Sequence, residues 1–417
     1  MKINTNPTKG TIDYLPADME IRQTAINKIL QTYKANGFLQ IKTPILENLQ
    51  ILTNGDSGDN QKLMFKTIKR GEKLNLNKPN LTEADITEEG LRYDLTVPLA
   101  RLYAGNKDKL PNPFKAIQID ESFRAEKPQR GRNRQFTQCD IDIWGDDSVF
   151  AECEIMLASV QAYKNVGINN IVLKINDRRA LAGLITYVGF APELVNNVCI
   201  SLDKLDKIGT ENVIAELNEK FAYLPNIKNM SAKLLMIIEE IKTACPNALV
   251  AYGIDEQIAD NLETIINVIT KYTNAKVVFD ITVVRGQGYY TGTVFECYTT
   301  DGGFNRAIGG GGRYDKMLEK FVGVNVPAVG YSIGLDPVVM LLKESGALVA
   351  SNKYALVYPK NASINAVFDA KVQLMNKNYE ISAFVEPKNY KNFCEKLKNN
   401  NFMGIIKLDN LQKIINL

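Results

Sequence analysis

The chain has 417 residues, of which 45% are hydrophobic and 23% charged, and its net charge is +3. This composition is typical of a folded protein with two or three domains. The sequence contains no histidine, which excludes histidine-based acid–base catalysis, histidine metal ligands and histidine pH switches.

Three further features bear on location. No apolar run reaches the ~18 residues that a membrane-spanning helix needs. The N-terminal segment MKINTNPTKG lacks the apolar core of a signal peptide. The six cysteines are scattered, without a Cys-x-x-Cys pair, and indicate reduced thiols. We therefore expect a cytoplasmic protein without a membrane segment.

The first predicted elements are a helix over residues 17–36, stopped by Gly37, and a strand over residues 37–47. Pro44 restricts that strand to a sheet edge or to a contact with a partner chain. Residues 91–104 then indicate a strand that enters a helix, with Asp94 and Thr96 on one face of the strand.

The most informative stretch runs from Phe114 to Gly145 and predicts two strands joined by a cationic loop. Its arginines and lysine suit the binding of phosphate, although a solvated basic loop is the plainer alternative. On the returning strand, polar side chains alternate with apolar ones, so three of them share one face that is otherwise apolar enough to be buried. The basic residues are Arg124, Lys127, Arg130, Arg132 and Arg134, and the three on the strand are Gln138, Asp140 and Asp142. Carboxylates facing arginines indicate a site for a zwitterionic or polyphosphate ligand.

The middle of the chain is predicted to be mostly helical. An apolar stripe that includes Phe150 and Cys153 indicates a helix to about Asn165, and residues 172–272 carry amphipathic helical patterns without a chemical motif. We interpret the latter as an inserted helical subdomain.

Candidate chemistry returns at residues 277–284, an apolar run typical of a strand buried on both faces, which ends at Arg285. A buried arginine needs an anion, so a ligand and a structural salt bridge are both open. Tyr289 and Tyr290 then lead into another strand. Four glycines at residues 309–312 permit close approach of backbone to a ligand, but they also fit a plain loop.

The C-terminal part predicts a glycine-punctuated strand that enters a helix from about Asp336, a linker at residues 345–353 and a small βαβαβ domain. From residue 351 onward there are ten lysines and five acidic residues, so this tail carries +5. A basic tail fits contact with a polyanion, and a solvated lysine-rich surface is equally common.

Taken together, several segments resemble histidyl-tRNA synthetases, a family of class II aminoacyl-tRNA synthetases. The resemblance runs from about residue 9 to residue 342. The family's N-terminal segment resembles KGTIDYLP, and its dimer-forming first motif resembles GFLQIKTPILE. Its second motif, whose loop holds ATP, resembles SFRAEKPQRGRNRQFTQCDIDIWG. The histidine-specific signature and its companion resemble VVRGQGYYTGTVFE and GGGGRYD. The insertion of the eukaryotic-like branch resembles LKINDRRALAGL and SLDKLDKIG.

The resemblance implies an α+β fold: an antiparallel sheet flanked by helices, a helical insertion and a small C-terminal α/β domain. It also implies a homodimer that joins L-histidine to histidine tRNA through histidyl-adenylate, using ATP and Mg²⁺. Arg124 and Arg132 would hold the ATP phosphates, with Glu126 near the adenine or the metal. The histidine-binding residues would be Asp94, Thr96, Gln138, Asp142, Arg285, Tyr289 and Tyr290. Arg285 and Arg124 would act in catalysis, and no side chain is assigned to the metal.

Three departures from the family pattern stand out. Pro337 occupies the place where the third motif usually carries an arginine for the γ-phosphate of ATP, and Gly288 replaces the usual acid of the signature. The 67-residue tail resembles the family's anticodon-binding domain but is shorter. Pro337 and the short tail leave a second interpretation open, a regulatory subunit of ATP phosphoribosyltransferase. The expected domains are residues 1–173, 174–272, 273–344 and 351–417.

Overall fold

The computed structural model describes residues 3–54, 63–242, 244–284, 288–300, 304–346 and 351–417. The chain divides into two compact units. The first comprises Met1–Ile12 and Ala25–Ser345, and the second comprises Asp13–Thr24 and Gly346–Leu417.

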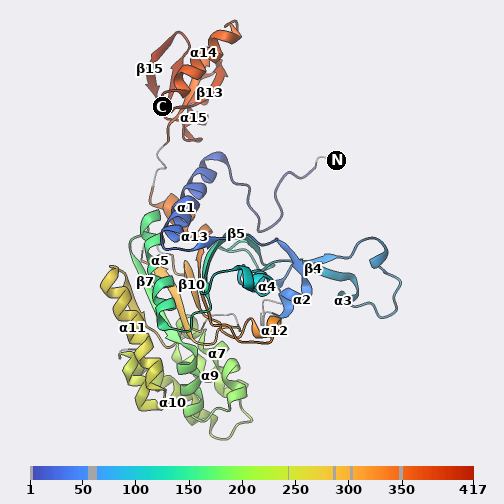
Figure 1. Ribbon diagram of the computed structural model, residues 1–417, viewed down its shortest axis with the longest axis vertical. Helices are drawn as coiled ribbons and strands as arrows, with labels where there is room; N and C mark the ends of the chain where they lie inside the picture. Colours follow the sequence, from blue (N-terminus) through green and yellow to red (C-terminus); the bar gives the residue numbers. More distant parts are fainter. Residues whose placement is uncertain (1–2, 55–62, 243, 285–287, 301–303, 347–350) are drawn as a thin grey trace. The chain divides into compact units, whose positions relative to one another are not determined.

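The first unit is built on an eight-stranded sheet, whose strands lie in the order β1-β5-β6-β11-β10-β9-β7-β8 (Figure 1). Pairing is antiparallel from β5 through to β7, and only the two outer strands pair in parallel. The bounds are β1 Leu39–Gln40, β5 Phe114–Phe123, β6 Gln135–Trp144, β7 Ile171–Asp177, β8 Lys276–Phe279, β9 Thr293–Thr299, β10 Gly309–Arg313 and β11 Ala328–Gly334. This is the expected antiparallel sheet flanked by helices.

The long hairpin of β5 and β6 forms as predicted. The two strands pair from Phe114 opposite Trp144 to Phe123 opposite Gln135. From Thr137 onward every residue of β6 is buried, because this strand lies inside the sheet between β5 and β11. Its alternation directs Cys139 and Ile141 to one face and the polar row of Gln138, Asp140 and Asp142 to the other.

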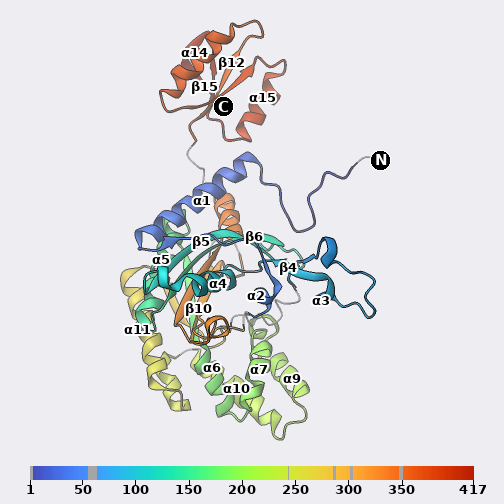
Figure 2. The same ribbon diagram turned by 45° about the vertical axis from the view of Figure 1, so that its right-hand side comes forward.

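Helices cover both faces of this sheet (Figures 1 and 2). Helix α5 (Val149–Val166) packs against β6 and β11 on the Cys139 face and ends at Gly167, whose positive φ of 104° suits glycine. Helix α4 (Thr96–Asn106) packs on the opposite face, where Tyr103 stacks on Trp144 with a centroid distance of 5.2 Å. Helix α4 and the polar row therefore share a face.

Helix α1 begins at a proline and ends before Gly37, as expected, and the division between the two units falls within it, after Thr24. Up to residue 272, the α-helices other than α4 and α5 are α1 Pro16–Ala35, α2 Leu49–Asn54, α3 Glu83–Ile86, α6 Arg178–Tyr187, α7 Val195–Leu202, α8 Leu205–Ile208, α9 Thr210–Lys220, α10 Ile227–Ile241 and α11 Glu256–Tyr272. Two more, α12 Glu319–Val322 and α13 Leu335–Glu344, follow β10 and β11. None of the described helices combines the length and hydropathy needed to cross a membrane.

Two expected strands differ from the observed ones. The strand predicted over residues 37–47 is divided around Pro44 into β1 and β2 (Leu46–Asn48), and β2 joins a smaller sheet with β3 (Lys66–Ile68) and β4 (Thr87–Leu91). The strand predicted over residues 277–284 is only β8, a partly buried edge strand. It ends because the Asp280 carboxylate accepts hydrogen bonds from the backbone and hydroxyl of Thr282 and forms a turn.

The segment predicted to be helical begins with a strand. Because β7 pairs with β9 in the main sheet, the boundary expected after residue 173 falls inside β7, and helices start only at Arg178. Phe150, expected in the apolar stripe of α5, is 62% exposed.

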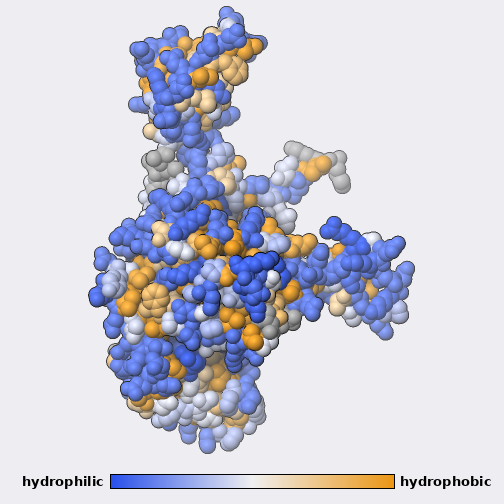
Figure 3. Space-filling model, viewed as in Figure 1, coloured by the Kyte–Doolittle hydropathy of each residue, from blue (hydrophilic) through white to orange (hydrophobic). Residues whose placement is uncertain are grey.

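The second unit contains the predicted βαβαβ arrangement and one additional strand. Strands β13, β12 and β14 are parallel, and β15 adds an antiparallel edge. One face of α14 exposes Ile364, Phe368 and Val372. Figure 3 shows hydrophobic residues at the surface of this unit. The bounds are β12 Lys353–Tyr358, α14 Ile364–Met375, β13 Glu380–Val385, α15 Tyr390–Lys398, β14 Gly404–Lys407 and β15 Asn410–Asn416.

Candidate functional site

A cavity of about 220 Å³ opens on the α4 face of the main sheet. Its walls come from β6, β10 and β11, from the loop between β5 and β6, and from the first turns of α4 and α13. It brings together the predicted site residues that the structure describes: Asp94, Thr96, Arg124, Glu126, Arg132, Gln138, Asp142, Tyr289 and Tyr290. The predicted residue Arg285 lies outside the described residues.

One end of the cavity is acidic. Asp94, Asp140 and Asp142 are each at most 3% exposed. Burial is the main cause that raises the pKa of all three carboxyl groups, and the pKa of Asp142 reaches about 7. Burial makes the ionised form of these carboxyl groups unfavourable in free energy, and a cationic ligand in the cavity would offset that cost.

Asp142 is held by residues that are distant in sequence. The Tyr314 hydroxyl donates a hydrogen bond to Asp142 Oδ1, and Gly330 on the neighbouring strand leaves room for the carboxylate. Tyr314 in turn packs edge-on against Tyr289 and Trp144. The carboxylate orientation is therefore fixed from two sides.

Asp94 and Thr96 do not lie on a strand, contrary to the prediction. Strand β4 ends at Leu91, and Thr96 is the first residue of α4. The Asp94 carboxylate accepts a hydrogen bond from the Val97 backbone at 3.1 Å, so it satisfies an amide at the start of α4. Tyr289 also bonds to Asp94 and Thr96 through its hydroxyl. The two residues still meet in the cavity, because the start of a helix brings them there.

The other end of the cavity is basic. Arg124 donates to the Tyr93 carbonyl at 3.0 Å, and its guanidinium lies 5.0 Å from the centroid of the Phe136 ring. Arg132 pairs with Glu126 at 2.9 Å and is 55% exposed. The two arginines differ accordingly: Arg124 is fixed by its neighbours, whereas Arg132 remains accessible at the mouth.

The other basic residues of the loop are engaged elsewhere or do not line the cavity. Arg130 pairs with Glu344 of α13, and Arg134 donates to the Glu126 carbonyl at 3.0 Å. Lys127 does not line the cavity either. Of the five basic residues predicted in this loop, two therefore line the cavity, Arg124 and Arg132.

The glycine run is a strand rather than a loop. Residues Gly309–Arg313 form β10 inside the main sheet. A Cβ at Gly309 would lie 2.1 Å from the Tyr163 hydroxyl, and one at Gly311 would lie 1.9 Å from the Gly330 carbonyl. These glycines are required because neighbouring groups fill the space of a side chain, although three of them also line the cavity.

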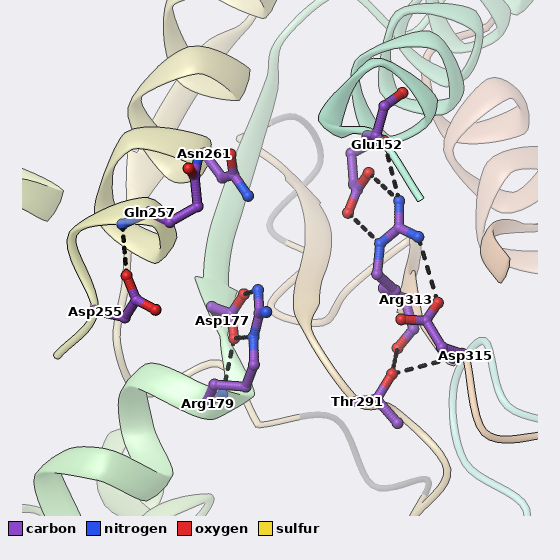
Figure 4. A network of polar contacts seen from close by, with 10 residues as sticks. Glu152, Asp177, Arg179, Asp255, Gln257, Asn261, Thr291, Arg313 and Asp315 are labelled. Atoms are coloured by element: carbon purple, nitrogen blue, oxygen red, sulfur yellow. Dashed lines mark hydrogen bonds and ion pairs between the residues drawn. The ribbon is translucent and has the colours of Figure 1, made fainter. Parts of the chain in front are cut away.

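Arg313, at the end of β10, is not among the residues that line the cavity. Its guanidinium meets the Glu152 carboxylate through two hydrogen bonds, at 2.6 and 2.5 Å, and lies 3.3 Å from Asp315 (Figure 4). Both partners of the Arg313–Glu152 pair are buried. This arginine joins β10 to α5 and serves the fold.

Pro337 and Asp336 line the cavity from the first turn of α13. A proline fits there because the first amides of a helix have no intrahelical acceptor. Among the described lining residues, the basic ones are Arg124 and Arg132.

The described residues contain no group of three or more cysteine or acidic side chains arranged to hold a metal ion. Single carboxylates, those of Glu126 and Asp336, do line the cavity. Mg²⁺ is commonly held by one or two carboxylates together with substrate phosphates. The carboxylates of Glu126 and Asp336 would suit an ion held in this way.

Several lining residues had no role in the sequence-based prediction, among them Tyr314, Gly330 and Ser332, whereas Asp140 belonged to the predicted polar row without an assigned ligand group. Asp140 was visible by its spacing on the polar face of β6. Tyr314 and the two residues on β11 carry no local signal, since only the pairing of β11 with β6 places Gly330 beside Asp142.

Comparison with known proteins gives a consistent result. A family model described as histidyl-tRNA synthetase matches residues 10–338. A histidine–tRNA ligase from Leifsonia xyli subsp. xyli is 37% identical over 384 residues, which cover 88% of this chain and 87% of the relative.

Two solved structures share the fold. Histidyl-tRNA synthetase from Nostoc sp. PCC 7120 gives a TM-score of 0.77 at 23% identity, covering 100% of this chain and 97% of that one. A Bacillus halodurans C protein, described as an ATP phosphoribosyltransferase regulatory subunit/histidyl-tRNA synthetase, gives a TM-score of 0.76 at 20% identity, with coverages of 98% and 99%. At these identities the likeness concerns the fold alone.

Proposed function

The chain belongs to the histidyl-tRNA synthetase family, and we propose that it joins L-histidine to its tRNA through a histidyl-adenylate intermediate. One observation of the cavity supports this function above others. Its acidic end and its basic end lie on the same face of the sheet, as a site for an amino acid beside a nucleotide requires. ATP is the nucleotide that the family uses.

The acidic end would bind histidine. In this arrangement Asp94, Thr96 and Gln138 receive the α-ammonium group, and Asp142 accepts the N–H of the imidazole ring. Tyr289 and Tyr290 close the pocket around the ring. A site built from buried polar groups rejects ligands that cannot satisfy them, so apolar amino acids of similar size would bind poorly.

The basic end would bind ATP. Arg124 and Arg132 would hold its phosphates, and Glu126 would lie near the adenine or the metal. Mg²⁺, when bound with ATP near Glu126, would neutralise phosphate charge. Arg285 follows β8 and the turn at Asp280 in sequence, and we propose that it contacts the histidine carboxylate and the α-phosphate.

The chemistry needs little beyond this arrangement. The histidine carboxylate attacks the α-phosphorus, and pyrophosphate leaves. A carboxylate at neutral pH is already a nucleophile, so the protein supplies alignment and charge stabilisation rather than a base. Arg124 is suited to this because its position is fixed before the substrate binds. A protein without histidine can therefore perform the reaction.

We further propose a homodimer. Strand β1 is an edge of the main sheet, and Leu39, Ile45 and Leu46 on and after it are exposed to 51%, 36% and 37%. Apolar residues at an open sheet edge are a liability unless another chain covers them. Light scattering combined with size-exclusion chromatography would test this, and a monomer at micromolar concentration would contradict it.

Other parts of the proposal concern the domains and the cell. We assign residues 1–177 and 273–344 to the catalytic domain, because β7 belongs to the main sheet, residues 178–272 to a helical insertion like that of the eukaryotic-like branch, and residues 351–417 to contact with histidine tRNA. The surplus of lysine in the last segment supports the tRNA contact. The cytoplasm, where tRNA is charged, is the expected location.

The decisive experiment is histidine-dependent exchange of pyrophosphate into ATP by the purified protein. Exchange is expected with L-histidine and not with other amino acids. If histidine binds but no exchange occurs, the catalytic function is wrong, and the regulatory interpretation replaces it. In the cavity, Pro337 in place of a cation fits the second interpretation, whereas the retained Arg124 and Arg132 favour the first.

Arg285→Ala tests the catalytic assignment. It should abolish exchange while the far-UV circular dichroism and the melting temperature stay near those of the wild type. Arg306→Ala is a suitable control, because Arg306 is an exposed arginine that bonds to Gln129 in the loop and does not line the cavity. Near-normal exchange by Arg285→Ala would show that the role is misassigned.

A further inference from the structure

The polar row on β6 has a middle member without a role in the proposed function. Asp140 lies between Gln138 and Asp142, lines the cavity and is 3% exposed. In the sheet it faces Gln118 of β5 and Ser332 of β11. A buried carboxylate is costly and calls for a specific explanation.

The hydrogen bonds around Asp140 have a definite direction. The Gln138 side-chain nitrogen Nε2 donates to Ser332 Oγ at 3.1 Å. Ser332 pairs with Asp140 across strands β11 and β6, and its hydroxyl is placed to donate to the Asp140 carboxylate, an interaction that lowers the pKa of Asp140. Because a hydroxyl has a single hydrogen, donating it to the carboxylate leaves only lone pairs, which can accept from Gln138. The chain of donors therefore runs from Gln138 through Ser332 to Asp140.

This direction determines what Gln138 offers to a ligand. Its nitrogen is directed to Ser332, with Asp140 Oδ2 at 3.5 Å, the limit of a hydrogen bond. Its oxygen Oε1 is buried and has no hydrogen-bond partner among the described residues, and the same holds for Asp140 Oδ1. Buried acceptors without donors are expensive, so they indicate a ligand that brings donors. An ammonium group brings three.

We infer that Asp140 is a positioning residue that, through Ser332, turns the oxygen of the Gln138 amide toward the α-ammonium group of histidine. The inference rests on the proposed placement of histidine in this cavity. An ionised carboxylate cannot donate, so only one orientation of the amide satisfies the chain of hydrogen bonds. The reversed amide would aim an N–H at a cation.

The charge state of Asp140 is consistent with this role once a ligand is bound. Burial, followed by the neighbouring Asp142 carboxylate, raises the pKa of Asp140 well above its ordinary value. A cationic ammonium group beside Asp140 favours the ionised form and opposes that rise. The bound substrate and the orientation of the amide therefore reinforce each other.

The test uses Asp140→Asn and two ligands. L-Histidine carries the ammonium group, and 3-(imidazol-4-yl)propionate is the same molecule without it. An asparagine can donate to Ser332 and so permits the reversed amide. Calorimetry should show L-histidine binding weakened by about 10- to 100-fold, the range for a lost hydrogen bond to a charged group. Binding of the propionate should be nearly unchanged.

A matched control comes from the same strand. Asp142→Asn should weaken both ligands together, because Asp142 is assigned to the ring that they share. If Asp140→Asn also weakens both equally, or changes neither, the inference is wrong. Wild-type protein that binds neither ligand would instead refute the placement of histidine in this cavity, which separates the two failures.

A second variant provides rescue. Gln138→Glu presents an oxygen in every orientation, and in combination with Asp140→Asn it avoids two adjacent carboxylates. The double variant should regain most of the affinity for L-histidine that Asp140→Asn loses. A folded double variant that is no better than Asp140→Asn would overturn the inference. If Asp140→Asn does not fold, Ser332→Ala interrupts the same chain and should show the same selective loss.

Discussion

The Asp142 carboxylate occupies the space that a side chain on Gly330 would need. A Cβ built at Gly330 would lie 2.0 Å from Asp142 Oδ1, and strands β6 and β11 pair these two residues directly. The glycine is required by its neighbour rather than by its own backbone, since Gly330 lies in a regular strand. A change at one position therefore moves the functional group of the other.

Gly330→Ala should consequently impair histidine binding. The added methyl group pushes the carboxylate away from the Tyr314 hydroxyl and from the proposed ring position, and the KM for L-histidine in pyrophosphate exchange should rise by about 10-fold or more. Gly105→Ala is the matched control, because a Cβ at Gly105 of α4 meets nothing within 4 Å. Equal KM values for the two variants would contradict the steric argument.

Asp142→Asn should make the protein more stable at pH 8 while it weakens histidine binding. Burial raises the pKa of Asp142 from 3.8 to about 7. The folded protein thus holds this proton between about pH 4 and 7, where the unfolded chain releases it, so stability falls as pH rises through that window. The full cost, on the order of 4 kcal/mol as an upper bound, is present at pH 8 and absent near pH 4.

The measurement is thermal unfolding of both proteins at pH 5 and pH 8. The variant should melt several degrees above the wild type at pH 8, and the difference should shrink at pH 5. An asparagine can still accept the Tyr314 hydrogen bond, so that contact is retained. A variant that melts lower at both values would show that the charge is compensated in the folded protein.

Arg313→Met tests the assignment of this arginine to the fold. Removing the guanidinium leaves the Glu152 carboxylate, 3% exposed, without its partner, and breaking such a buried pair typically costs ~3–5 kcal/mol. Urea unfolding should show the loss, and Arg313→Met with Glu152→Leu should recover part of it. Lys207→Met is the control, since Lys207 and Asp203 are an exposed pair. Normal stability with a raised KM would instead indicate a direct role in the site.

The sequence was most informative where side-chain periodicity and burial agree. The hairpin of β5 and β6 was predicted from the alternation of polar and apolar residues. Because β6 is buried, the polar side chains on one of its faces line a cavity. Asp94 and Thr96 were assigned to the cavity by resemblance, but their spacing was misread as a strand. Two polar residues that are two positions apart can lie on one face of a strand, but they can also stand at the start of a helix. Here the hydrogen bond from the Val97 backbone to the Asp94 carboxylate shows that a helix begins.

Other features depend on contacts that no local pattern contains. The glycines of β10 were interpreted as a close approach to a ligand or as a plain loop, whereas they form a strand in which other strands and Tyr163 fill the space around Gly309 and Gly311. The length of β8 was overestimated because apolar residues continue to Val284, while Asp280 pairs with Lys174 at 2.8 Å and bends the chain. Such outcomes are set by tertiary packing, which overrides propensity.

The last prediction concerns Pro337, the third residue of α13 and part of the cavity wall. The resemblance to histidyl-tRNA synthetases implies an arginine at this place for the γ-phosphate of ATP, and losing one such contact can cost ~10²–10³-fold in rate. Pro337→Arg should therefore lower the KM for ATP, by about 10-fold if half of that effect is regained in binding. The KM for L-histidine should not change.

Pro337→Ala is the control that separates the effect of the new cation from the effect of losing the proline, and it should leave the KM for ATP unchanged. If Pro337→Arg folds and uses ATP no better than Pro337→Ala, this site does not lack a phosphate contact there, and Arg124 and Arg132 suffice for it.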